Sequence, residues 1–247
     1  MLENRNFILS SITEILKESA DISKLNCNGI EAYPMQDYIL QSTFLKMTGY
    51  SEQKIKCICW DIASIDYDFR YQVYQNWTFG ECSNIDDKNK IYKILVEKIK
   101  EYDPYFNVTS FIKNISDTEN YIIINTFNTC RKILNASSLK YYYERDFNNF
   151  KNDITTFDGT LDICKTENKI FNKNDLFDQI YKSLYKQRNR CAHNLKSYQQ
   201  NLPRISELLK KSQKDNYFYY FTILIILDEV FIELYKKLSE LILKYNW

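Results

Sequence analysis

Glycine, proline and histidine are all scarce in this chain of 247 residues. It has 4 glycines and 3 prolines, whereas average usage would give roughly 17 and 12. The glycines stand apart from one another, at positions 29, 49, 80 and 159. Glycine-rich phosphate-binding loops of the Rossmann, P-loop and protein-kinase types are therefore excluded. The single histidine, His193, excludes a histidine-rich metal site, and we expect neither a metal nor another cofactor.

Long apolar runs are also missing. The most apolar run, 217–227, is eleven residues long and is followed by two acidic residues, whereas a helix that spans a bilayer needs roughly 20. The first residues include an acid and lead into apolar residues at helical spacing, so we expect no signal peptide. The seven cysteines are odd in number and contain no C-x-x-C, which favours reduced thiols over a secreted disulfide framework. We therefore predict a cytoplasmic protein with no membrane partner.

Apolar residues recur at helical spacing along the whole chain, and turn-forming residues are rare. This predicts an all-α fold, an antiparallel helical bundle that residues 1–247 form as a single domain. The expected helices cover residues 5–20, 36–48, 51–75, 85–103, 116–135, 141–150, 174–196 and 215–247, where 36–48 and 51–75 form either one helix or two. Gly49 is a candidate break between the second and third of these, and 157–171 should form a loop with room for a short hairpin.

Positive charge is concentrated in one segment, although the whole chain has a net charge of only +1. Residues 179–214 contain nine lysines and arginines against one acid, Glu207, which is a net charge of +8 and leaves −7 for the rest of the chain. Such a segment is typical of a site for a polyanion. The alternative is an ordinary solvated helix face.

The same segment contains the heptapeptide Arg188-Asn189-Arg190-Cys191-Ala192-His193-Asn194. The only histidine thus follows an arginine by five residues, with a polar residue after the arginine and a small one before the histidine. In the penultimate long helix of an all-α chain, this motif resembles the R-x4–6-H signature of the HEPN superfamily. Many members of that superfamily are metal-independent ribonucleases of toxin–antitoxin, abortive-infection and CRISPR-associated systems. A second segment, Gly49 to Lys54, is similar to a region in which some HEPN families place an acidic residue, here Glu52.

The resemblance implies a HEPN-like bundle with extra helices, whose motif-bearing core covers about 36–76 and 172–247. It implies that the catalytic residues are Arg188, His193, Asn189 and Glu52. The expected RNA-binding residues are Arg190, Asn194, Lys186 and Lys196. The implied partners are RNA, a second copy of the chain, and an antitoxin or other defence-system protein. The chain departs from the HepT-type toxins, because Leu195 stands where these have the tyrosine that a nucleotidyltransferase antitoxin modifies.

Cleavage of RNA by its own 2′-hydroxyl suits these residue types without a metal. Histidine titrates near neutrality, so it can take the 2′-hydroxyl proton or give one to the leaving 5′-oxygen. Arginine binds phosphate oxygens in a bidentate manner and stays charged while negative charge builds up on the phosphorane. These roles predict products with 2′,3′-cyclic phosphate ends.

The spacing of Arg188 and His193 limits how one chain can use both. Five residues at about 100° each place them about 140° apart around a continuous helix. Either the helix bends near the motif, or two copies of the chain each supply part of one site. The resemblance implies the second arrangement. We expect the contact on the outer sides of 174–196 and 215–247, because Ile225, Ile226, Ile232 and Ile242 make the last helix apolar on more than one face.

Together these features predict a metal-independent RNA endonuclease that acts as a prokaryotic defence or toxin effector. One alternative is a catalytically inactive HEPN-like module that binds RNA or a protein. A second alternative is a helical subunit of a larger defence assembly, with its basic segment facing another protein.

Overall fold

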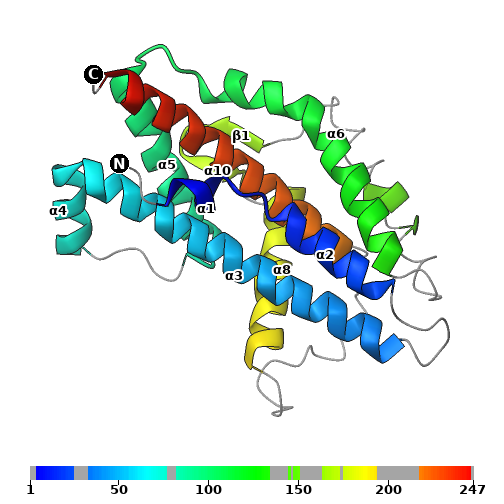
Figure 1. Ribbon diagram of the computed structural model, residues 1–247. Helices are drawn as coiled ribbons and strands as arrows, with labels where there is room; N and C mark the ends of the chain where they lie inside the picture. Colours follow the sequence, from blue (N-terminus) through cyan, green and yellow to red (C-terminus); the bar gives the residue numbers. More distant parts are fainter. Residues whose placement is uncertain are drawn as a thin grey trace.

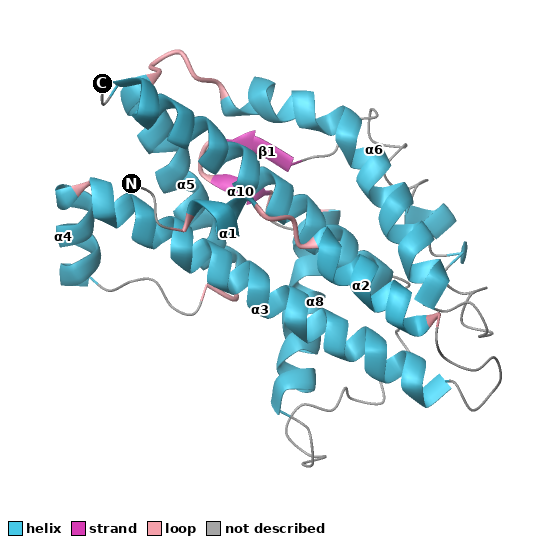
Figure 2. Cartoon of the chain, in the orientation of Figure 1, coloured by secondary structure: helices cyan, strands magenta, loops and turns pink. Residues whose placement is uncertain are grey.

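A computed structural model describes residues 4–24, 33–76, 82–133, 144–145, 147–150, 163–172, 175–193 and 217–245, and only the backbone of 33, 34, 74, 76, 113–120 and 193. The helices are α1 (Arg5–Leu9), α2 (Thr13–Ser23), α3 (Tyr33–Ile65), α4 (Tyr67–Asn76), α5 (Ile85–Tyr102), α6 (Val108–Ile133), α8 (Leu176–His193) and α10 (Tyr217–Tyr245). Strands β1 (Ile163–Thr166) and β2 (Lys169–Phe171) pair as an antiparallel hairpin, with Ile163 opposite Phe171 (Figure 2). The predicted all-α character is confirmed, and the hairpin lies within 157–171, the segment that was expected to be a loop with room for a short hairpin.

Helix α10 forms the centre of the bundle. In Figure 1 it runs through the middle of the molecule, between α3 and α6, and it contacts α1, α3, α5, α6 and α8. Apolar side chains are buried on every side of this helix as far as Ile242, including those of Ile225, Ile226 and Ile232, and only Leu243 and Tyr245 near its end are exposed. The expectation that these four isoleucines contact a second copy is therefore wrong, because helices of the same chain cover them.

A buried ion pair joins α3 to α10. The ammonium of Lys54 lies 2.6 Å from Oδ1 of Asp228, and both side chains are only 2% exposed. The other oxygen of Asp228 accepts a hydrogen bond of 2.9 Å from the backbone N–H of Ile12. That N–H lies between α1 and α2, so the first predicted helix is in fact two helices, and Asp228 satisfies a donor at their junction.

Two predicted helix ends are wrong because a side chain caps the helix elsewhere. Helix α3 continues through Gly49 and ends at Ile65, where the carboxylate of Asp66 accepts a 2.8 Å hydrogen bond from the N–H of Phe69 in α4. Helix α6 begins at Val108 rather than near 116, and the Asn107 side chain accepts a 2.9 Å bond from the N–H of Ser110. The predicted end of the helix before Pro104 is confirmed, since α5 ends at Tyr102.

The remaining segments pack around this frame. Residues 144–145 and 147–150 are helical, as predicted, and the ring of Phe147 stacks on Phe127 of α6 with 4.0 Å between centroids. Side chains of α5 hold the hairpin, since Tyr92 donates to the carbonyl of Thr166 (3.0 Å) and Asn89 accepts from the N–H of Ile170 (3.0 Å). Helix α8 runs across α3 in Figure 1 and contacts α3, α5 and α10. The predicted end of α8 near 196 and the start of α10 near 215 lie outside the described residues.

Gly49 offers a test of the helix that continues through it. It is exposed in the middle of α3, and a Cβ atom there would meet no atom within 4 Å. We expect Gly49→Ala to raise the free energy of unfolding by about 0.5–1 kcal/mol, because alanine loses less conformational entropy in a helix. Urea unfolding measures this as a higher midpoint at an unchanged slope. Gln53→Ala, at another exposed position of α3, is the control and should change the midpoint less. A lower midpoint for Gly49→Ala would mean that the helix is interrupted there.

Candidate functional site

Arg188 continues the buried side of α8. Tyr181 and Leu184 are buried on this side, and Arg188 follows them at the i+7 and i+4 positions, so it lies on the same face. The arginine side chain is 25% exposed. The helix therefore carries the guanidinium to the edge of the core, against α3, rather than out into solvent.

Glu52 faces it from α3. Its neighbours Thr48 and Ser51 are buried, and the side chain of Glu52 is only 13% exposed. Oε2 of Glu52 lies 3.1 Å from Nη2 of Arg188, and Nη1 of Arg188 donates a 3.2 Å hydrogen bond to Oδ1 of Asn189. The structure thus brings together three of the four predicted catalytic residues, from positions that are 136 residues apart in the chain.

A buried lysine lies behind this pair. Lys88 of α5 is 1% exposed, and its ammonium donates a hydrogen bond of 3.3 Å to Oγ of Ser51. Among the described residues it makes no other hydrogen bond and no ion pair. Burial lowers the pKa of Lys88 to about 8, and the negative charge of Glu52 is the largest influence that opposes this. The candidate site therefore contains a cation that is poorly compensated.

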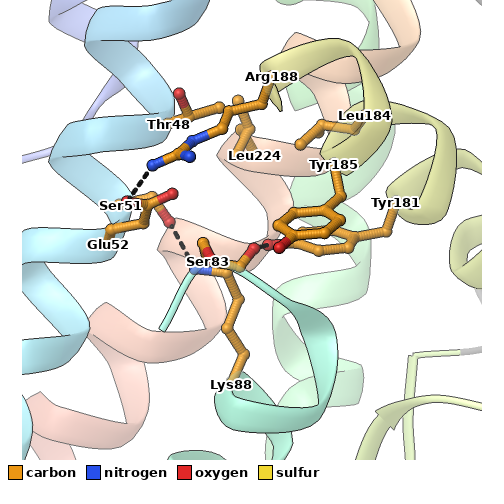
Figure 3. Close-up of a pocket in the computed structure, with 10 residues that line it drawn as sticks. All are labelled: Thr48, Ser51, Glu52, Ser83, Lys88, Tyr181, Leu184, Tyr185, Arg188 and Leu224. Carbon is orange, nitrogen blue, oxygen red and sulfur yellow. Dashed lines mark hydrogen bonds and ion pairs between the residues drawn. The ribbon is translucent and has the colours of Figure 1, made fainter. Parts of the chain in front are cut away.

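The space between these side chains is small. It measures about 10 Å³, which is room for about one water molecule. Figure 3 shows the residues that line it: Thr48, Ser51, Glu52, Ser83, Lys88, Tyr181, Leu184, Tyr185, Arg188 and Leu224. Tyr181 closes one side by donating a 2.8 Å hydrogen bond to the carbonyl of Ser83. A nucleotide cannot enter such a space, so a phosphate could reach Arg188 only from its exposed side.

The other predicted site residues lie further along α8 or beyond it. Lys186 is exposed, and Arg190 is half-buried. Helix α8 ends at His193, whose backbone alone is described, and Asn194 and Lys196 lie outside the described residues. The structure therefore brings Arg188, Asn189 and Glu52 together and leaves the position of the histidine side chain open.

The helix of the motif is continuous. Residues 176–193 are α-helical throughout, without a break between Arg188 and His193. Positions 188 and 193 consequently lie about 140° apart around the axis of α8. Each described side chain from Tyr185 to Ala192 is at least partly exposed, and this end of α8 extends past α3 in Figure 1.

Part of the basic segment is neutralised within the chain. Lys182 forms an ion pair of 2.6 Å with Asp178 of the same helix, and Arg188 is paired with Glu52. Six cysteines of the described residues are free thiols. One of them is Cys191 in the motif, where burial raises the pKa of the thiol. Within the part of the chain that is described, no three His, Cys, Asp or Glu side chains are arranged to hold a metal ion.

Lys88 is the site residue that the sequence reasoning missed. It lies three residues before Ile91, in line with the buried stripe of Ile91, Leu95 and Ile99. A lysine on the apolar face of an amphipathic helix was the available signal, because lysine is almost never fully buried without a partner. The same signal marks Lys54, which precedes the buried Ile55 and Ile58 on α3.

The pKa of Lys88 predicts how stability depends on pH. A pKa of about 8 in the folded protein against 10.5 in the unfolded chain corresponds to a penalty of about 3 kcal/mol. The penalty is full below pH 8 and shrinks as pH rises toward 10.5, because in that window the unfolded chain binds more protons. We therefore expect Lys88→Met to be more stable than the wild type at pH 7, by an amount that decreases between pH 8 and pH 10.

Chemical denaturation of both proteins across this pH range measures the difference. Lys93→Met on the same helix is the control, because Lys93 is about half exposed and is paired with the exposed Glu97, so its effect should change less between pH 7 and pH 9. A Lys88→Met protein that is less stable at pH 7 would show that the neighbours of Lys88 compensate its charge fully.

Comparisons with known proteins give this chain no relatives. No protein-family model, no curated protein and no solved structure matches it. In the described residues, no helix has both the length and the apolar character that crossing a lipid bilayer requires. The features of this chain that bear on its function are therefore the motif, the order of the helices and the geometry around Arg188.

Proposed function

We propose that this chain is a metal-independent RNA endonuclease of the HEPN type, a defence or toxin effector that acts on RNA in the cytoplasm. The observation that carries the proposal is the ion pair between Arg188 and Glu52, 3.1 Å apart on α8 and α3. The sequence singles out these two residues independently, one in the R-x4-H motif and one in a distant acidic segment. Their meeting at the edge of the core supports a common site.

The side chains of this site can divide the chemistry among them. Arg188 binds the scissile phosphate and stabilises the charge of the phosphorane. Asn189 and Glu52, which both accept hydrogen bonds from its guanidinium, orient it. His193 moves the protons, as the base for the 2′-hydroxyl or the acid for the 5′-oxygen. Because both bond changes occur at one phosphorus, the reaction needs no cofactor and leaves a 2′,3′-cyclic phosphate.

The continuous helix α8 supports a composite site between two copies of the chain. Positions 188 and 193 lie about 140° apart on a continuous helix, so a single chain cannot easily direct both at one phosphate. In a dimer with a two-fold axis, the exposed end of α8 in one copy can face the exposed end of α8 in the other. Arg188 of one copy and His193 of the other can then point at the same phosphate. The isoleucines of α10 are occupied inside the chain, so the contact is assigned to α8. The exposed Lys186 and the half-buried Arg190 then flank the bound RNA backbone.

The first functional prediction concerns cleavage. We expect the purified protein to cut single-stranded RNA to products with 2′,3′-cyclic phosphate ends, at an unchanged rate in excess EDTA. Arg188→Ala and His193→Ala should each lower the rate by at least about 100-fold, because each removes one element of transition-state stabilisation or proton transfer. Gel analysis of labelled RNA and mass spectrometry of the ends measure both effects.

Arg131→Ala is the matched control for the arginine. Arg131 lies on α6, about half exposed and paired with Glu144 at 3.4 Å, so its loss should leave the rate unchanged. Loss of cleavage in EDTA, or full activity in both motif variants, would contradict the proposal. RNA that is bound but never cut would favour the inactive RNA-binding module.

The second functional prediction concerns the composite site. An Arg188→Ala chain and a His193→Ala chain should each be inactive alone, yet recover activity when they are mixed and allowed to exchange. Random pairing makes half of the dimers mixed, each with one intact site of two, so recovery should approach about a quarter of the wild-type rate. The measurement is the cleavage rate after refolding equal amounts together.

The control is a mixture of two separately prepared Arg188→Ala samples, which should stay inactive. If both residues act within one chain, mixing the two variants restores nothing. A fully active protein that sediments as a monomer would also exclude the composite site.

A further inference from the structure

Glu52 lies between two cations. On one side its carboxylate is paired with the guanidinium of Arg188 at 3.1 Å, and on the other side Lys88 reaches toward Ser51 and Glu52 (Figure 3). Lys88 donates to Ser51 at 3.3 Å, a long hydrogen bond for an ammonium. The carboxylate can therefore exchange one cation for the other by a small movement of side chains.

RNA binding creates a need for such an exchange. A phosphate that approaches the exposed side of Arg188 competes with Glu52 for the guanidinium, because both anions prefer its paired N–H donors. If Arg188 turns to the phosphate, Glu52 is left 13% exposed beside a second negative charge. In a partly buried setting, an unneutralised carboxylate next to an anion opposes binding.

We propose that Lys88 is a positioning residue, which neutralises Glu52 when Arg188 turns from Glu52 to an RNA phosphate. This inference rests on the proposed function, since it assumes that phosphate binds at Arg188. The ammonium has three N–H donors and uses one of them in the described structure. It can therefore accept Glu52 as a partner without giving up another ion pair.

The neighbouring groups cannot take this role. Lys54 is held by Asp228 at 2.6 Å. The hydroxyl of Tyr181 donates to the carbonyl of Ser83. Asn189 already accepts from Arg188, and its amide carries no charge. Of the two cations that line the cavity, Arg188 is paired with Glu52, and Lys88 forms no ion pair with a described residue.

The exchange also gives phosphate binding a pH dependence. The groups that act on the charge of Lys88 are Glu52 on α3, Cys82 before α5, Asp228 on α10 and Asp87 on α5 itself, while Tyr181 and Arg188 face the same cavity from α8. Burial lowers the pKa of Lys88 and the four acidic groups raise it, and the result is a pKa of about 8. An ammonium that pairs with Glu52 gains a higher pKa on binding, so phosphate affinity should fall as pH rises above about 8.

The first arm of the test requires no RNA. The pKa of Lys88 is followed by NMR in the full chain, labelled at the lysine Cε and assigned with Lys88→Met. Arg188→Ala mimics the departure of Arg188, so the pKa of Lys88 should rise from about 8 toward its usual 10.5. The same substitution made in a Glu52→Gln protein should produce no rise, because no carboxylate remains to be transferred. A rise of equal size in the Glu52→Gln protein would show direct repulsion between Arg188 and Lys88, and would overturn the inference.

The second arm measures the binding of a 2′-O-methyl oligoribonucleotide, which cannot be cleaved through its 2′ position. Lys88→Met should weaken binding about tenfold in the wild-type background, the size expected for a partly buried charge pair. In the Glu52→Gln background the same change should weaken it less than about twofold. Raising the pH from 7 to 9 should weaken binding by the wild type and not by Lys88→Met. Equal losses in both backgrounds would overturn the role of Lys88.

The two arms separate this inference from the proposed function. An oligonucleotide that fails to bind the wild type, while the pKa of Lys88 responds to Arg188→Ala only through Glu52, would contradict the proposed RNA site and support the exchange. Binding that is intact while the pKa does not respond would overturn the exchange alone. Lys90→Met, on the exposed side of α5, controls for a general loss of positive charge. Chemical denaturation of Lys88→Met at pH 7 shows whether this variant is folded under the conditions of the binding assay.

Discussion

The buried ion pair between Lys54 and Asp228 fixes the geometry on which the candidate site depends. Two charges at 2% exposure are tolerated in a core only if they stay together, because breaking a buried pair costs about 3–5 kcal/mol. The pair therefore sets how α3 is rotated against α10, and Asp228 also holds the junction of α1 and α2 through Ile12. Since residues of a helix are about 100° apart, turning Lys54 toward α10 turns Ser51 toward α5 and Glu52 toward α8. The ion pair of Lys54 with Asp228 thus directs Glu52, two residues earlier in α3, toward Arg188.

Of Lys54, Arg188 and Lys88, the first two form ion pairs with described residues and the third does not. Lys54 is matched with Asp228, and Arg188 with Glu52. Lys88 is left with a hydroxyl at 3.3 Å. Its lowered pKa expresses a free-energy cost that a methionine of similar size would avoid. Proteins tolerate such a cost most often at functional sites, and here the costly cation lies directly behind the acid that holds the motif arginine.

Local patterns in the sequence predicted most of the fold and part of the site. Periodic apolar residues located α5, α8 and α10, and the spacing of Arg188 and Asn189 in the motif located one half of the site. The patterns failed where residues distant in the sequence determine a helix end or the burial of a side chain. Gly49 lies within α3 because packing on both sides holds the helix, whereas Asp66 ends it by capping α4. The surplus of isoleucine on α10 led to the wrong expectation of a second copy, because periodicity cannot tell whether the residues that cover a helix belong to the same chain. Lys88 and Lys54 stand on apolar stripes, yet the acids that explain them lie far away in sequence.

The size of the space around Arg188 determines where any reaction can take place. A cavity of about 10 Å³ can hold a water molecule but no phosphate, so the cluster of Glu52, Lys88 and Tyr181 cannot itself be a substrate pocket. The cluster holds the guanidinium of Arg188 through Glu52, while the arginine side chain remains 25% exposed. In the proposed mechanism the reaction would therefore take place at the end of α8, where each described side chain from Tyr185 to Ala192 is at least partly exposed. A second copy of the chain that faces this side would complete the site. Its α8 would direct His193 toward the phosphate at Arg188, which His193 of the first copy, about 140° away on the same helix, cannot reach.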